Sequence, residues 1–263
     1  MFLDKSDVRR AFGEDEFFPF FQPLIELRTG QLAGFEALAR WNHARLGAIC
    51  PDAFISIVQS CGFIDTLTQR LLGKIFAAAP LLPSSLRLSI NLSPLQLLDL
   101  TLPGRIAAAA EIGGFPLERL TIEMTEGALL EDLARAGEVA GELKALKCRL
   151  ALDDFGTGYS SLMHLQALPF DELKLDRKFI RSMTQSRESE KIVGAVVGLG
   201  QSLELTTVAE GVETEEQANM LIDFGCDLAQ GWHFGRPASA GEIPRMVSAA
   251  YIVCPALSAA CAD

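Results

Sequence analysis

Short strand-like runs along the chain end in side chains that could bind a metal ion. The runs cover residues 87–91 (RLSIN), 120–124 (LTIEM), 149–153 (RLALD), 172–176 (ELKLD) and 206–210 (TTVAE). One further acid, Glu36, lies in the segment GFEALAR, at the expected end of the second strand. A single acid at a strand end is unremarkable, but the same placement on so many strands is hard to explain as solvated surface. The candidate residues are Glu36, Asn91, Glu123, Asp153, Asp154, Asp176 and Glu210.

Oxygen ligands at this density suit Mg²⁺ or Mn²⁺, whereas zinc prefers histidine and cysteine. Several carboxylates cannot lie together unpaired, because they would repel one another and some would take up protons. Two divalent cations about 3.5–4 Å apart would remove this repulsion, and such pairs activate water for phosphoester hydrolysis. The alternative is that these acids cap the helices that follow each strand.

Four further features could assist this chemistry. Lys174 shares a strand face with Asp176 and could hold the attacking water or neutralise a phosphate oxygen; the alternative is a plain ion pair with Asp176. Residues 153–161 (DDFGTGYSS) allow a tight glycine-rich turn beside the metals, or form a mere connecting loop. Glu126 could accept hydrogen bonds from that loop, or could simply start a helix. Arg40 could bind a phosphate oxygen with two parallel hydrogen bonds.

The sequence pattern predicts that strands alternating with helices position these residues. The strand ends are separated by roughly 20 to 35 residues, the length of a strand with a crossover helix, which indicates a parallel sheet. In the runs at 87–91, 120–124 and 172–176 the aliphatic residues alternate with the polar ones, so the polar set faces the lumen of a barrel. The carboxyl ends of barrel strands form the active-site face, where the candidate acids would meet.

Three local patterns refine this topology. FFQPLIEL and QLAGFEAL flank residues 28–30 and predict a hairpin, so the first two strands should be antiparallel. Residues 190–203 have the apolar periodicity of a helix. Thr214 and Gln217 predict a capping box for the next helix, and Gly225 predicts its end.

Composition limits the possible functions. The chain has 263 residues, of which 49% are hydrophobic, and a net charge of −11. A strongly acidic chain repels phosphate and is a poor binder of DNA or RNA polymers. The sequence contains no uninterrupted apolar run long enough for a membrane span and begins without a secretory signal, so we expect a cytoplasmic protein.

Seven motifs in this order resemble the EAL domain, the bacterial phosphodiesterase that opens cyclic di-GMP. They span roughly residues 15–245 and comprise Glu36–Ala37–Leu38 with Arg40–Trp41, Asn91–Leu92–Ser93, Glu123–Met124–Thr125–Glu126, DDFGTGYSSL at 153–162, Lys174–Leu175–Asp176, AEGVE at 209–213, and Gln230–Gly231 before Arg236–Pro237. The resemblance implies a (β/α)8 TIM-type barrel with one antiparallel strand near the N-terminus. It also implies one domain over residues 1–263 with a short C-terminal tail.

The resemblance further implies hydrolysis of cyclic di-GMP to linear 5'-pGpG by a water that two Mg²⁺ or Mn²⁺ ions activate. The implied metal ligands are Glu36, Asn91, Glu123, Asp153, Asp154 and Glu210. The implied catalytic residues are Glu36, Lys174, Asp176 and Glu210. Substrate contacts fall to Gln22, Leu38, Arg40, Glu213 and Gln230, while Glu126 steadies the loop at 153–162, where a homodimer is expected to form.

Some members of this family bind the dinucleotide without cutting it, usually after losing a metal ligand or the loop. Here all of those positions are intact, which favours activity over a silent cyclic di-GMP receptor. Two departures lie outside the implied metal ligands. Ala44 stands where the family commonly has proline, and Gln59 stands where it often has glutamate.

Overall fold

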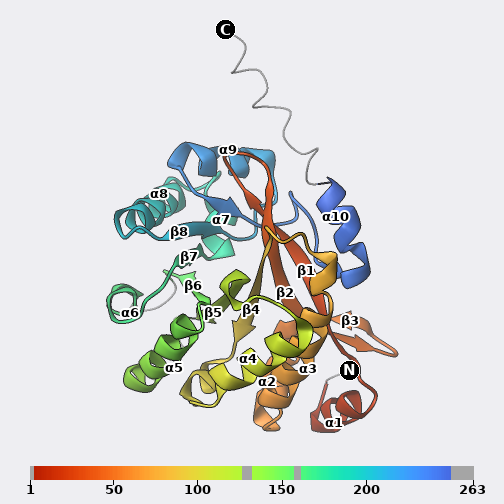
Figure 1. Cartoon of the computed structure of the whole chain (residues 1–263). Coiled ribbons are helices and arrows are strands. Elements are labelled where there is room, and N and C mark those ends of the chain that lie inside the picture. The colour runs from red at the N-terminus through yellow and green to blue at the C-terminus, as the bar shows by residue number, and fades with distance from the viewer. Residues whose placement is uncertain (1–2, 126–131, 157–160, 250–263) are drawn as a thin grey trace.

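Eight strands pair in a closed ring, and helices surround them (Figure 1). The computed structural model describes residues 3–125, 132–156 and 161–249. In ring order the strands are β1 (Phe17–Glu26), β2 (Leu32–His43), β4 (Arg87–Leu92), β5 (Leu120–Thr125), β6 (Arg149–Phe155), β7 (Glu172–Leu175), β8 (Thr206–Ala209) and β9 (Leu228–Ala229). This arrangement confirms the predicted (β/α)8 barrel.

The barrel has one antiparallel strand, as the hairpin pattern predicts. Strand β1 pairs antiparallel with β2 on one side and with β9 on the other. All other neighbouring strands of the ring, from the pair β2–β4 to the pair β8–β9, are parallel. Two short strands, β3 (Gly47–Ile49) and β10 (Ala238–Ser239), extend the sheet from β2 and β1.

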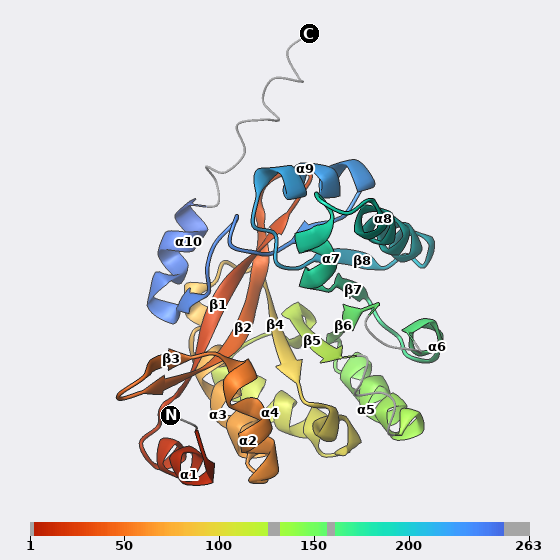
Figure 2. The same cartoon turned by 180° about the vertical axis from the view of Figure 1, so that it is seen from behind.

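Helices cover the outside of the ring, as the view from behind in Figure 2 also shows. Their bounds are α1 (Lys5–Gly13), α2 (Ile55–Ser60), α3 (Ile64–Ala77), α4 (Leu102–Gly113), α5 (Leu133–Ala145), α6 (Ser161–Ala167), α7 (Arg177–Ser182), α8 (Arg187–Ser202), α9 (Glu215–Phe224) and α10 (Ile243–Ala249). Within the described ranges no helix is long and apolar enough to cross a membrane. Helix α9 has the predicted capping box of Thr214 and Gln217 and ends at Gly225 in the left-handed region.

The outward faces of the strands and the inner faces of the helices form the main core. Leu88, Ile90 and Ile122 are buried in one cluster with Ile75 of α3 and Ile106 of α4. Burying this apolar surface is the dominant favourable contribution to folding. Because neighbouring strand residues face opposite ways, the same packing turns Ser89, Thr121 and Glu123 towards the lumen.

A partly buried ion pair lies at the amino-terminal ends of β6 and β7. Glu172, at the start of β7, accepts a hydrogen bond of 2.9 Å from Arg149 Nε and one of 3.4 Å from Thr121 Oγ1. Its side chain is 3% exposed, so the pair is closed off from solvent on the carboxylate side. The polar residues at the other ends of the strands are therefore left to form a separate cluster at the carboxyl-terminal mouth.

Candidate active site

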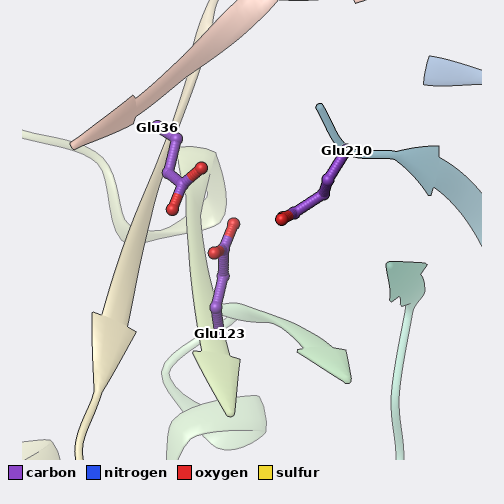
Figure 3. A group of neighbouring side chains, drawn as sticks. All are labelled: Glu36, Glu123 and Glu210. Carbon is purple, nitrogen blue, oxygen red and sulfur yellow. The ribbon is translucent and has the colours of Figure 1, made fainter. Parts of the chain in front are cut away.

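Three glutamates from well-separated strands point towards one another at the mouth of the barrel (Figure 3). Glu123 lies on β5, and Glu210 directly follows β8. Glu36 lies within β2 and not at its end as predicted, because the strand continues to His43. Each offers one carboxylate oxygen, and these three oxygens lie within 4.8 Å of one another. Glu36 and Glu123 are almost completely buried. The three carboxylates are therefore close enough to share a metal ion.

Two carboxamides orient this group. Asn91 Nδ2 donates a hydrogen bond of 2.6 Å to Glu36 Oε1, so the neutral residue of the predicted set contacts the acid on the neighbouring strand. Gln230 Nε2 donates to the other oxygen of Glu36 and, at 3.5 Å, to Glu210 Oε1. Both glutamates are thus held in position from the side of the ring where β9 closes the barrel.

The ammonium of Lys174 lies among four carboxylates. Its Nζ is 2.5 Å from both Glu123 Oε2 and Glu210 Oε1, 3.7 Å from Asp153 Oδ1 and 3.9 Å from Glu36 Oε2. The lysine side chain is only 2% exposed. The sequence also allowed Lys174 to form a simple ion pair with Asp176. The structure does not support that alternative, because the Lys174 ammonium lies among the candidate metal ligands.

Burial and mutual repulsion perturb the acids of this cluster. Burial raises the pKa of Glu123 well above its ordinary value, and the charge of Glu36 adds to the rise. Burial together with the charge of Asp153 raises the pKa of Glu210 to about 8. Burial would also raise the pKa of Glu36, but the charge of Lys174 and the hydrogen bond from Gln230 outweigh it and lower that pKa. A divalent cation would replace the protons that such a cluster otherwise holds.

The pKa of Lys174 moves in the direction that keeps it charged. Burial alone would lower the pKa of this amine, but the carboxylates of Asp153 and Glu123 outweigh burial and raise it well above its ordinary value. The ammonium therefore compensates part of the negative charge at the mouth.

A second acidic group lies beside the first. Asp153 lies within β6, and its Oδ1 accepts a 2.8 Å hydrogen bond from the backbone N–H of Asp154. Asp154 itself adopts a positive φ of 56°. A register irregularity between β6 and β7 falls at this point. Burial, then the charges of Asp153 and Asp176, raises the pKa of Asp154 to about 6. This turn places Asp154 against Asp176, and the charge of Lys174 also acts on Asp154.

The five predicted strand ends shift by one or two residues. Strands β4, β5 and β6 run on to Leu92, Thr125 and Phe155, whereas β7 and β8 stop one residue early. Strand β7 ends at Leu175, and Asp176 begins α7 as its N-cap by accepting a 2.7 Å hydrogen bond from the Lys178 backbone. Strand β8 likewise ends at Ala209, so Glu210 lies just beyond it. Both acids remain at the mouth, because a residue that follows a strand still lies at its carboxyl end.

The residues expected to contact substrate are less uniformly placed. Gln22 is the cross-strand partner of Glu36 and donates a 3.2 Å hydrogen bond to the Gly235 carbonyl. Leu38 and Arg40 follow Glu36 at two-residue spacing on β2, so they share its face. Arg40 donates a 2.8 Å hydrogen bond to the carbonyl of Ala39, and its guanidinium lies over the Phe20 ring.

Glu213 is engaged by a partner that the sequence pattern did not single out. Its Oε1 accepts hydrogen bonds of 3.0 and 2.5 Å from Arg181 of α7. The sequence carries no periodic signal for this contact between residues 32 positions apart. Glu126 and residues 157–160 of the predicted loop lie outside the described residues.

Comparisons with known proteins relate the chain to one family. The family model of the EAL domain matches residues 5–237. The cyclic di-GMP phosphodiesterase RocR of Pseudomonas aeruginosa is 37% identical over 235 residues, which cover 88% of this chain and 60% of RocR. An uncharacterized signaling protein of Caulobacter vibrioides is 42% identical over 232 residues, which cover 88% of this chain and 29% of that protein. The chain thus spans only part of the length of these curated relatives.

A solved structure shares the same fold. The structure of the PaMucR phosphodiesterase in complex with c-di-GMP superposes with a TM-score of 0.86 at 33% identity, covering 90% of this chain and 98% of that chain. Because the family model matches most of the sequence, the chain belongs to the EAL domain family.

Proposed function

We propose that this protein hydrolyses cyclic di-GMP to linear 5'-pGpG with two Mg²⁺ or Mn²⁺ ions per active site. The observation that carries the proposal is the buried group of Glu36, Glu123 and Glu210 at the barrel mouth of an EAL family chain. Relatives named as cyclic di-GMP phosphodiesterases support the choice of substrate. The oxygen donors fit a hard divalent cation, and the cluster already encloses a cationic ammonium.

In this proposal, six residues hold the metal ions: Glu36, Asn91, Glu123, Asp153, Asp154 and Glu210. Bound divalent cations would supply an activated water and positive charge for the phosphodiester. Asn91 contributes an oxygen ligand without adding negative charge, and its amide nitrogen keeps Glu36 in position. Gln230 supports Glu36 and Glu210 from the opposite side.

Lys174 and Asp176 assist the attacking water. The Lys174 ammonium faces Glu123 and Glu210, where it can hold a water oxygen or stabilise negative charge that develops on the phosphate. Asp176 contacts Asp154 and can orient the water from the second acidic group. Gln22, Leu38, Arg40 and Glu213 line the approach for the substrate.

The experiment is a turnover assay followed by chromatography. Purified protein is incubated with cyclic di-GMP and either Mg²⁺, Mn²⁺ or a chelator, and the products are separated. We expect linear pGpG in both metal arms and none with the chelator. The Glu36→Ala variant should form no pGpG. The control variant Glu142→Ala, which lacks an exposed acid on α5, should still form it.

The same assay separates the competing function. Tight binding of cyclic di-GMP without product would identify a silent receptor. Neither binding nor product would exclude both functions. The proposal also includes a homodimer through the region of residues 153–162, which light scattering after size-exclusion chromatography tests directly.

A further inference from the structure

An ion pair reaches across the mouth of the barrel. Arg177 Nη2 of α7 lies 3.9 Å from Asp52 Oδ2, which belongs to the 3-10 turn Pro51–Ala53 after β3. Strand β7 leads into α7, while β2 and β3 lead into the turn. In the ring order, β2 and β7 are four strands apart in either direction. The contact therefore joins opposite walls of the mouth, and we call it the Asp52–Arg177 latch.

The stem of Arg177 is fixed beside the proposed metal site. Gly211 follows Glu210 and has a positive φ of 69°, and a Cβ atom built on it would lie 2.7 Å from Arg177 Cβ. The backbone of the Glu210–Gly211 turn therefore packs directly against the first carbon of the Arg177 side chain. The preceding residue, Asp176, caps α7 and fixes the backbone on the other side.

The far end of Arg177 is only loosely held. The side chains of Arg177 and Asp52 are 64% and 84% exposed, and at 3.9 Å their nitrogen and oxygen atoms are too far apart for a hydrogen bond. Exposed pairs of this kind contribute little to stability because water screens them. The guanidinium can therefore leave Asp52 for a better anion without disturbing the fold.

Charge at the mouth calls for such a cation. Six carboxylates and one ammonium give the cluster a formal charge of −5, which two divalent cations change to −1; the groups are Glu36, Glu123, Asp153, Asp154, Asp176, Glu210 and Lys174. A cyclic dinucleotide brings two phosphodiester charges, and the metal ions neutralise only the one that is cut. The second phosphodiester needs a cation outside the metal site, and a guanidinium binds phosphate with paired hydrogen bonds.

We propose that Arg177 binds the phosphodiester of the substrate that is not cut, and that it exchanges Asp52 for this phosphate when the cyclic dinucleotide enters. The proposal rests on the proposed function and adds a substrate-binding residue to it. Asp52 acts as the competing anion that holds the guanidinium over the mouth before the substrate arrives.

Steady-state kinetics with cyclic di-GMP test the latch, because its two partners should act in opposite directions. Arg177→Ala should raise KM about 10-fold, the effect of losing one charge-assisted contact, with kcat within about 2-fold of the wild type. Asp52→Asn should lower KM about 2-fold, because the guanidinium is no longer held by a competing anion. Arg177→Lys should fall between Arg177→Ala and the wild type.

Lys178→Ala is the matched control. It removes one positive charge from the next position of the same exposed helix, where Lys178 Nζ lies over the Phe179 ring, and it should change KM by less than about 2-fold. Raising the salt concentration should reduce kcat/KM more for the wild type than for Arg177→Ala, since the variant lacks the charged contact.

Two results would overturn the latch while leaving the proposed function intact. One is an unchanged KM in Arg177→Ala when the wild type hydrolyses the substrate. The other is a KM that rises in Asp52→Asn as it does in Arg177→Ala, which would indicate that the pair merely holds the mouth together. A wild type without any turnover would overturn the proposed function and the latch together.

Discussion

Replacing Lys174 with methionine tests how much the Lys174 ammonium stabilises the metal-free barrel against its buried acids. Methionine keeps most of the side-chain volume but removes the ammonium that lies 2.5 Å from Glu123 and Glu210. Breaking a buried ion pair by removing one partner typically costs about 3–5 kcal/mol. The lower end applies here, because Glu123 and Glu210 have raised pKa values and can take up protons instead.

A loss of about 3 kcal/mol corresponds to a fall of roughly 6–10 °C in the melting temperature of a chain of this size. The measurement is thermal unfolding in buffer with a chelator. Lys144→Met is the control, since its ion pair with Asp171 at 2.7 Å is one-third exposed on the lysine side and should contribute less than about 1 kcal/mol.

Adding Mn²⁺ should then stabilise Lys174→Met more than the wild type. The cation supplies the positive charge that the variant lacks, and binding to the folded state raises stability by mass action. Turnover should nevertheless fall at least about 100-fold, the usual effect of losing a charge-stabilising donor. Two results together would contradict this role of Lys174. The metal-free variant would melt within about 2 °C of the wild type, a shift that corresponds to no more than about 1 kcal/mol, and Mn²⁺ would raise its melting temperature no more than that of the wild type.

Three further predictions concern the same mouth. Glu36→Ala and Asp153→Ala should each lower turnover at least about 100-fold while circular dichroism shows an intact fold; near-normal rates in both would contradict the assignment of metal ligands. Metal-free protein should lose stability as the pH rises from about 4.5 to about 8, because folded Glu210 keeps a proton that the unfolded chain releases, whereas Mn²⁺ affinity should rise over the same window; calorimetry at several pH values checks both signs. Gly231→Ala should lower the melting temperature and turnover together, because its Cβ would lie 2.0 Å from the carbonyl oxygen of Val212; an unchanged melting curve would count against that close approach.

Much of the barrel follows from local patterns in the sequence. Alternation of aliphatic and polar residues in β4, β5 and β7 predicts which face of these strands enters the lumen, and parallel pairing then brings the polar ends together. Asn91 and Glu123 are direct partners in the β4–β5 register, so a pattern read along each strand was sufficient to predict their proximity. The β1–β2 hairpin and the cap at Thr214 depend on residues close together in the sequence, so local patterns also predict them.

Other features depend on how distant segments close the ring. Gln230 contacts Glu36 across 194 positions, and it follows β9, a strand of only two residues that carries no periodic signal. The positive φ of Asp154 arises at a register irregularity between two strands and not from a glycine. Lys174 was predicted to share a face with Asp176, but its place among four carboxylates requires all the strands together.

Anomalous diffraction from crystals grown with Mn²⁺ and cyclic di-GMP would show whether the carboxylates at the barrel mouth hold two metal ions. We predict one Mn²⁺ peak in contact with Glu36, Glu123 and Glu210, and a second about 3.5–4 Å away on the side of Asp153 and Asp154. A map with no peak in contact with these carboxylates, and with the Lys174 ammonium still between Glu123 and Glu210, would contradict the assignment of this mouth as a two-metal active site.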